Sequence, residues 1–151
     1  MTEMKTMKPE EVTKGETPSK LIPCDRKRAL VVDDEKAITL VFRDSIEHVL
    51  PGLAVDSAEN GQVALEAFSK GHHAVLIMDL SMPVMDGQRA YQEIEKVCRE
   101  RNWEMPSVLF CTGYAPPGSL SRILNRPMHG LLLKPISGLD VARAVQSRLR
   151  R

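Results

Sequence analysis

The sequence is poor in several features that mark common classes of protein. Only six of its 151 residues are aromatic (three Phe, two Tyr and one Trp), which argues against a base-stacking surface. The longest apolar run, Ala74–Met78, is far too short to cross a bilayer, and the amino terminus lacks the apolar core of a signal peptide. Three cysteines without a C-x-x-C spacing argue against a disulfide framework or a zinc site. We therefore expect a cytoplasmic protein without a membrane partner.

Excess charge and the common catalytic loops are lacking as well. Lys and Arg total 21 against 20 for Asp and Glu, so a net charge of +1 gives no general attraction to nucleic acid. No G-x-x-x-x-G-K-[ST] loop, G-x-G-x-x-G turn or G-x-S-x-G elbow occurs, which leaves nucleotide binding and serine hydrolysis unsupported. The four histidines show no metal-ligand spacing. His72 and His73 are expected to form an exposed pair in a loop.

Two regions differ in their pattern of polar residues. Residues 1–27 are polar and mixed in charge, contain Pro9, Pro18 and Pro23, and lack an apolar period. They are predicted to form a flexible N-terminal tail. Residues 28–151 are predicted to form one compact domain, as the length of the chain allows. We expect no further output domain.

From Ala29 onward, short apolar runs alternate with stretches of helical period, which is typical of repeated βα units. The runs expected to form buried strands are residues 29–32, 53–55, 75–78, 108–111 and 131–133. A helix is expected after each strand; Pro51 ends the first, and the fourth is kept short between Pro117 and Pro127. The alternation predicts an α/β fold, a doubly wound (βα)5 sandwich with a five-stranded parallel sheet. Trp103 is expected to anchor the edge of the core.

Polar residues with reactive side chains stand at the ends of four predicted strands. Asp33 and Asp34 follow the first strand, Asp79 the third, Thr112 the fourth and Lys134 the fifth. Each residue alone has an ordinary structural explanation, but parallel strands bring all of them to one edge of the sheet. Three clustered carboxylates repel each other by roughly 1–4 kcal/mol per pair at about 4 Å. We therefore expect Lys134 and a bound Mg²⁺ ion to balance them.

These residues lie in longer strings that carry a family resemblance. The strings are Val31-Val32-Asp33-Asp34-Glu35, Asp79-Leu80-Ser81-Met82-Pro83-Val84-Met85-Asp86-Gly87, Thr112-Gly113 and Lys134-Pro135. In this combination they resemble the receiver domain of two-component response regulators (CheY-like), over about residues 27–151. The resemblance implies a flavodoxin-like form of the predicted sandwich and a role in phosphorelay signal transduction.

The resemblance implies a phosphorylation site at the predicted sheet edge. Asp79 corresponds to the phosphoacceptor, which takes a phosphoryl group from a sensor histidine kinase or a phosphotransfer protein. Lys134 would pair with that group, and Thr112 would donate its hydroxyl to it after transfer. In receivers the peptide bond between the residues matching Lys134 and Pro135 is typically cis.

The resemblance also implies Mg²⁺ as the cofactor. Asp34 corresponds to a direct metal ligand and Asp33 to the second acid, which usually acts through water. The Asp79 carboxylate and the backbone carbonyl of Ser81 would complete the share of the metal shell that the protein supplies. These are the hard oxygen ligands that Mg²⁺ prefers.

Receivers act by changing shape, so the resemblance implies a signalling protein and not an enzyme, apart from its own phosphorylation and dephosphorylation. Phosphorylation would shift the surface formed by the fourth helix, the fifth strand and the fifth helix, and so control a downstream protein. The protein would be a monomer or a phosphorylation-dependent dimer, without direct contact to nucleic acid. Leu131 stands where many receivers have an inward-turning Tyr or Phe, which places an aromatic readout in question.

Three alternatives remain at this stage. The domain could be a receiver excised from a hybrid histidine kinase, or a receiver-like module that binds partners without phosphorylation. The complete set of reactive residues at the sheet edge argues against the second of these. An aspartyl-phosphate hydrolase is disfavoured because its motif has a second Asp two residues after the nucleophile, where this chain has Ser81.

Overall fold

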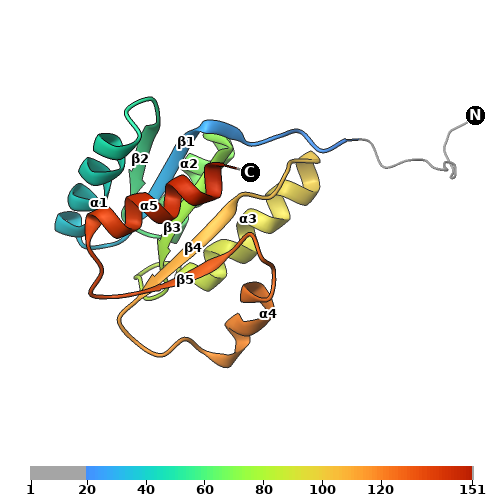
Figure 1. Ribbon diagram of the computed structural model, residues 1–151. Helices are drawn as coiled ribbons and strands as arrows, with labels where there is room; N and C mark the ends of the chain where they lie inside the picture. The colour runs from blue at the N-terminus through green and yellow to red at the C-terminus, as the bar shows by residue number, and fades with distance from the viewer. Residues whose placement is uncertain (1–19, 151) are drawn as a thin grey trace, which may run out of the picture.

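The computed structural model describes residues 20–150, which form one five-stranded parallel sheet between two layers of helices (Figure 1). The strands are β1 (Asp25–Val32), β2 (Ala54–Ala58), β3 (His73–Asp79), β4 (Ser107–Thr112) and β5 (Gly130–Leu133). The helices are α1 (Lys36–Val49), α2 (Gly61–Gly71), α3 (Gly87–Arg101), α4 (Ser121–Leu124) and α5 (Gly138–Leu149), with a 3-10 turn η1 (Gly118–Leu120) before α4. The strand order β2-β1-β3-β4-β5 confirms the predicted doubly wound (βα)5 fold.

The two faces of the sheet bury two separate apolar clusters because successive strand residues point to opposite sides. Ala29 and Val31 pack toward α1 and α5, whereas Leu30 and Val32 pack toward α2 and α3. All seven residues of β3 are buried, as befits the central strand of a sheet covered on both sides. The sheet is therefore buried between the two layers of helices, and the polar residues predicted to form the site follow its strands at their carboxyl ends.

Most of the predicted element boundaries hold, and caps explain several of them. The side chain of Asn60 accepts a hydrogen bond from Val63 N (2.9 Å) at the start of α2, and Asp86 accepts one from Arg89 N (2.8 Å) at the start of α3. As predicted, the fourth helix is short: α4 spans a single turn after η1. The second strand begins after Leu53 and extends to Ala58, three residues beyond the predicted run.

The chain before Ala29 is more ordered than predicted. The predicted tail, residues 1–27, lies outside the described residues as far as residue 19, but β1 already begins at Asp25. Ile22 forms a parallel bridge with Trp103, and the buried Cys24 donates through its thiol to the Glu104 carbonyl (3.3 Å). Regular structure therefore begins a few residues before the predicted boundary at residue 28, because residues 22–24 contact the loop after α3, which a local period does not reveal.

The prediction of an exposed His72–His73 pair is also wrong. His72 is 8% exposed and His73 is fully buried. The His72 ring stacks on Trp103, with 4.0 Å between ring centroids, which supports the expected role of Trp103 at the edge of the core. His73 opens β3 and lies against Asp56 Oδ2, 2.7 Å from its Nε2. Among residues 20–150, no helix is long and apolar enough to span a bilayer.

Candidate functional site

The carboxyl ends of the strands bring the predicted site residues to one edge of the sheet. Asp33 and Asp34 directly follow β1, Asp79 is the last residue of β3, and Thr112 is the last residue of β4. Lys134 directly follows β5, and its backbone N–H donates to the Thr112 carbonyl (2.8 Å). All five residues thus meet at the edge where ligands bind in open α/β sheets. We call this group the acidic edge.

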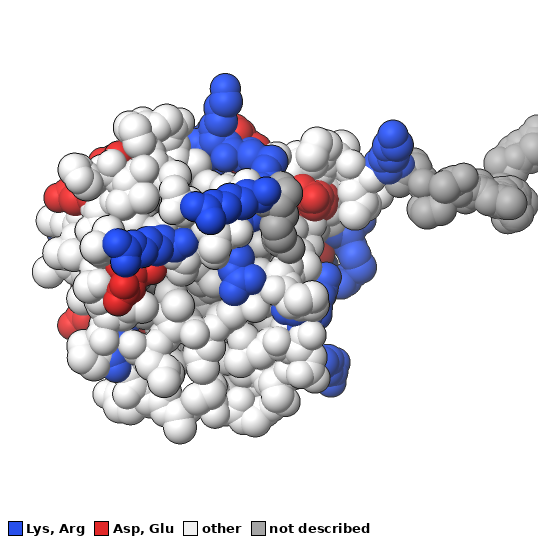
Figure 2. All heavy atoms as spheres, viewed as in Figure 1, with Lys and Arg blue, Asp and Glu red and all other residues white. Residues whose placement is uncertain are grey.

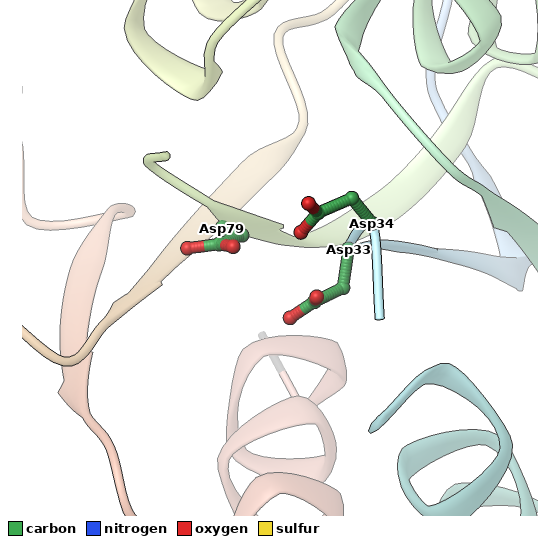
Figure 3. Close-up of side chains that lie close together, drawn as sticks. All are labelled: Asp33, Asp34 and Asp79. Carbon is green, nitrogen blue, oxygen red and sulfur yellow. The ribbon is translucent and has the colours of Figure 1, made fainter. Parts of the chain in front are cut away.

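Three carboxylates of the acidic edge face the same space (Figure 3). One ligand oxygen from each of Asp33, Asp34 and Asp79 lies within 4.8 Å of the others. Asp33 and Asp79 are 3% and 7% exposed, while Asp34 is open to solvent. A cluster of hard oxygen ligands with one solvent-facing side fits a magnesium ion, which keeps several of its waters.

Lys134 is the cation that reaches into this cluster. Its Nζ lies 2.9 Å from Asp33 Oδ2 and 3.7 Å from Asp79 Oδ2. Burial alone would lower the pKa of Lys134, but the hydrogen bond to Asp33 and the charges of Asp33 and Asp79 outweigh it and raise the pKa, so the amine stays protonated. The Lys134–Pro135 peptide bond is cis, as predicted.

One lysine does not balance three carboxylates. Burial raises the pKa of Asp79, and the nearby charge of Asp33 raises it further, against the opposing charge of Lys134. Asp33 is already occupied, because it accepts hydrogen bonds from Lys134 Nζ and from the backbone of Glu35 (2.9 Å each). Among the described residues, Asp79 accepts only a long hydrogen bond, from Ser81 N (3.3 Å), so of the two buried carboxylates it has the more unused bonding capacity.

The loop after β3 is held close to Asp79 by a glycine. A Cβ atom on Gly87 would lie 2.3 Å from the Asp79 carbonyl oxygen, so no other residue fits without a backbone shift. The Gly87 N–H donates to the Leu80 carbonyl (3.0 Å), which closes the loop. The close approach of Gly87 to the backbone of Asp79 was not predicted from the sequence. The turn holds Ser81 next to the acidic edge.

Thr112 and Tyr114 border a cleft beside Asp79. Thr112 is 3% exposed, and its hydroxyl accepts a hydrogen bond from Tyr114 N (3.2 Å). The cleft measures about 390 Å³ and is lined on its other side by Ser81 and Asp86. Because Asp79 pairs with Cys111 in register, Thr112 lies one residue farther along the neighbouring strand. A small ligand at Asp79 therefore has a hydroxyl and an ammonium group nearby.

Comparison with known proteins identifies this arrangement. The family model described as the response regulator receiver domain matches residues 29–146. This chain belongs to the response regulator receiver domain family. The match confirms the predicted resemblance and places the chain in two-component signalling. Receiver domains act in signalling.

Curated relatives include both embedded and free-standing receivers. The chain is 31% identical over 118 residues to the sensor protein GacS of Pseudomonas syringae pv. syringae, covering 78% of this chain and only 13% of GacS. It is 25% identical over 123 residues to the chemotaxis protein CheY of Halobacterium salinarum, covering 82% of this chain and 97% of CheY. The receiver thus spans a small part of the first relative and almost all of the second.

A solved structure gives the same fold with a metal present. The response regulator protein TrrA of Thermotoga maritima, in complex with Mg²⁺ and BeF, matches with a TM-score of 0.62 and 26% identity, covering 81% of this chain and 98% of TrrA. A receiver domain of a LuxO-type repressor protein from Vibrio parahaemolyticus matches with a TM-score of 0.70 at 20% identity, covering 83% and 92% of the two chains. The second likeness concerns the fold alone.

Proposed function

We propose that this receiver domain accepts a phosphoryl group on Asp79 from a histidine kinase or a phosphotransfer protein. One observation carries the proposal: Asp79 is a buried carboxylate with spare bonding capacity, close to the Asp33 carboxylate and to the Lys134 ammonium group. The likeness to sensor kinases such as GacS supports a phosphohistidine as the donor.

In the transfer step, a carboxylate oxygen of Asp79 attacks the phosphorus of the phosphohistidine. The new P–O bond forms as the P–N bond breaks, and the leaving imidazole keeps the electron pair. Lys134 neutralises charge on the phosphoryl oxygens, which its position 3.7 Å from Asp79 supports. Thr112 gives up its bond with Tyr114 N and donates its hydroxyl to the new phosphoryl group.

Asp33, Asp34 and Asp79, together with the Ser81 carbonyl, are the residues that would hold Mg²⁺. The test of fit is their donor set, in which carboxylate oxygens lie within 4.8 Å of each other and one side is open to solvent. When bound, the ion supplies positive charge against the phosphoryl oxygens. The complex of TrrA with Mg²⁺ and BeF supports this assignment.

The phosphoryl group changes the charge of the edge, since about two negative charges replace one. Lys134 joins the end of β5 and Thr112 the end of β4, so their movement is passed to α4, β5 and α5. The surface over β5 is largely uncharged in Figure 2, and Leu133 is 61% exposed there. This face would contact the downstream protein, or a second copy of the chain when phosphorylated. A switch from 1:99 to 99:1 requires about 5.5 kcal/mol of preference for one state.

The proposal is tested by incubating the protein with acetyl phosphate and Mg²⁺ and measuring its intact mass. We expect a gain of one phosphoryl group in the wild type and none in Asp79→Asn. Asp44→Asn, on the exposed side of α1, is the matched control and should be phosphorylated like the wild type. Omitting Mg²⁺ should abolish the gain in every variant.

Two outcomes would contradict the proposal. A wild type without added mass, under conditions in which it is folded, would favour a module that binds partners without phosphorylation. Equal phosphorylation of Asp79→Asn would assign the acceptor role to another carboxylate. Asp33→Asn and Asp34→Asn, tested in parallel, would then identify it.

A further inference from the structure

A groove next to α3 contains none of the three carboxylates of the acidic edge, although Gln88 lines both this groove and the cleft beside Asp79. Its lining residues come from α3 and from residues 119–126, and it measures about 460 Å³; Figure 1 shows α4 beside α3. Two side-chain bridges close its ends. Gln88 and Ser119 bond to each other at one end (3.0 and 3.2 Å), and Arg126 pairs with Glu95 at the other (3.3 Å). The volume is that of a small-molecule site.

The hydroxyl of Tyr91 lies in the wall of this groove, and its bonding can be assigned from its neighbours. The backbone N–H of Val108 donates to His129 Nδ1 (3.0 Å), so the single proton of the neutral imidazole is on Nε2. That Nε2–H donates to the Tyr91 oxygen (3.0 Å). Arg126, whose guanidinium has only donors, also donates to it (3.1 Å).

The Tyr91 oxygen therefore accepts two bonds, and its own hydrogen has no acceptor among the described residues. Tyr91 is 2% exposed, and burial raises its pKa, so the hydroxyl keeps this proton at neutral pH. A buried donor without an acceptor is unfavourable, which makes the hydroxyl a preferred binding point for an oxygen acceptor that enters the groove.

Charge in the groove favours an anionic acceptor. Glu95 balances Arg126, but Arg122 of α4 also lines the groove, and within residues 20–150 it forms no ion pair. Arg122 is exposed and its long side chain can reach across the opening. A buried hydroxyl donor and an exposed guanidinium in the lining of one groove together match a carboxylate or a phosphate group.

We propose that the groove between α3 and α4 binds a small organic anion, whose carboxylate or phosphate oxygen accepts from Tyr91 and pairs with Arg122. Such a ligand would touch both α3 and α4 and hold them together. Binding does not depend on phosphorylation of Asp79. An effect of the ligand on the α4 surface in signalling would rest on the function proposed above.

The test is an NMR titration of the unphosphorylated protein without Mg²⁺, using succinate and inorganic phosphate as separate probes at constant ionic strength. We expect saturable shifts confined to residues 88–95 and 119–126 for at least one probe. The probe that saturates at lower concentration identifies carboxylate or phosphate as the preferred group. Removal of one charge-assisted bond in Tyr91→Phe should weaken binding about tenfold.

Two further variants separate binding from folding. Arg122→Gln, at an exposed position, should weaken binding about fivefold without altering the fold. Arg143→Gln, an exposed arginine on α5, should leave binding unchanged. Shifts that do not saturate, or that are the same in Tyr91→Phe and Arg122→Gln as in the wild type, would overturn the proposal and leave a groove that holds water only. Because Mg²⁺ and phosphoryl donors are absent, neither result bears on phosphorylation of Asp79.

Discussion

Two polar clusters lie on the same sheet and are built in opposite ways. At the acidic edge, three carboxylates share one ammonium group, and the pKa of Asp79 is raised by burial and by Asp33. In the amino half of the sheet, a single carboxylate, Asp56, takes two donors: Arg28 Nη2 and His73 Nε2 each lie 2.7 Å from its Oδ2. The acidic edge thus has more negative charge than Lys134 can neutralise, whereas Asp56 has two hydrogen-bond donors for one carboxylate.

The difference shows in the pKa of the acids. Burial alone would raise the pKa of Asp56, but the hydrogen bonds from Arg28 and His73 outweigh it and the net shift is downward. At Asp79 the net shift is upward. The charge of Asp56 is stabilised within the fold, which is typical of a structural ion pair. The charge of the acidic edge is not fully compensated, which is typical of a site that binds a ligand from solution. The comparison yields four predictions, ordered by the size of the expected effect.

The largest effect is expected where the backbone is closest to Asp79. Gly87→Ala places a Cβ against the Asp79 carbonyl and should lower the free energy of unfolding by about 3 kcal/mol. Gly118→Ala is the control, since nothing lies within 4 Å of its Cβ, and should change stability by less than about 0.5 kcal/mol. Urea unfolding measures both. Equal stability of the two variants would show that the loop after β3 can move away from the edge at little cost.

The second largest effect on stability is expected at Asp56, the carboxylate that bonds to both Arg28 and His73. Asp56→Asn removes the charge that Arg28 and His73 share, and the free energy of unfolding should fall by about 1–2 kcal/mol, a value reduced because the Asp56 side chain is 41% exposed. Asp44→Asn, at an exposed position of α1 outside both clusters, should be neutral. A neutral result for Asp56→Asn would remove the contrast between the two clusters.

At the acidic edge, removal of a carboxylate charge should stabilise the fold, whereas at Asp56 it should destabilise it. In the absence of Mg²⁺, Asp79→Asn removes repulsion with Asp33 and should raise the free energy of unfolding by up to about 1 kcal/mol. Added Mg²⁺ should then stabilise the wild type more than the variant, because a ligand stabilises only the state that binds it. Calorimetry with and without the ion measures both effects. Destabilisation by Asp79→Asn without Mg²⁺ would contradict the account of uncompensated charge.

The smallest effect is the pH dependence of the amino half. Burial lowers the pKa of His73, although Asp56 opposes this, so the unfolded chain binds the proton first. Stability should therefore fall as the pH drops below about 6.5, by less than about 1 kcal/mol. His73→Asn should flatten this fall, whereas His48→Asn, at an exposed position, should preserve it. A wild type whose stability is constant down to about pH 5.5 would show that His73 titrates as it does in the unfolded chain.

The sequence was informative wherever a residue depends on its neighbours in the chain. The five strands and the residues at their ends follow from periodicity, because a parallel sheet aligns strand ends without knowledge of side-chain contacts. Thus Asp33, Asp34, Asp79, Thr112 and Lys134 were placed together correctly. Their roles in phosphoryl transfer stay predictions.

What the sequence did not reveal depends on contacts between distant segments. The buried Cys24 bonds to Glu104, and the buried His73 lies against Asp56 and Gly71; neither the Glu104 nor the Asp56 contact shows in a local pattern. The hydrogen-bonding of Tyr91 depends on His129, 38 residues away. Leu131 packs half-buried against the α2 and α3 side of the core, in the place where many receivers have an aromatic ring.

The shortness of α4 has a consequence for how this part of the chain opens. One turn of helix is far below the length that is stable alone, so α4 depends on the buried Leu120 and on the side-chain bridges to α3. Its amide hydrogens should therefore exchange with solvent by local opening, at a lower free energy than those of β3, which open only with the whole domain. Residues 118–126 would then act as a small independent unit, able to unfold and refold many times while the sheet beneath them remains closed.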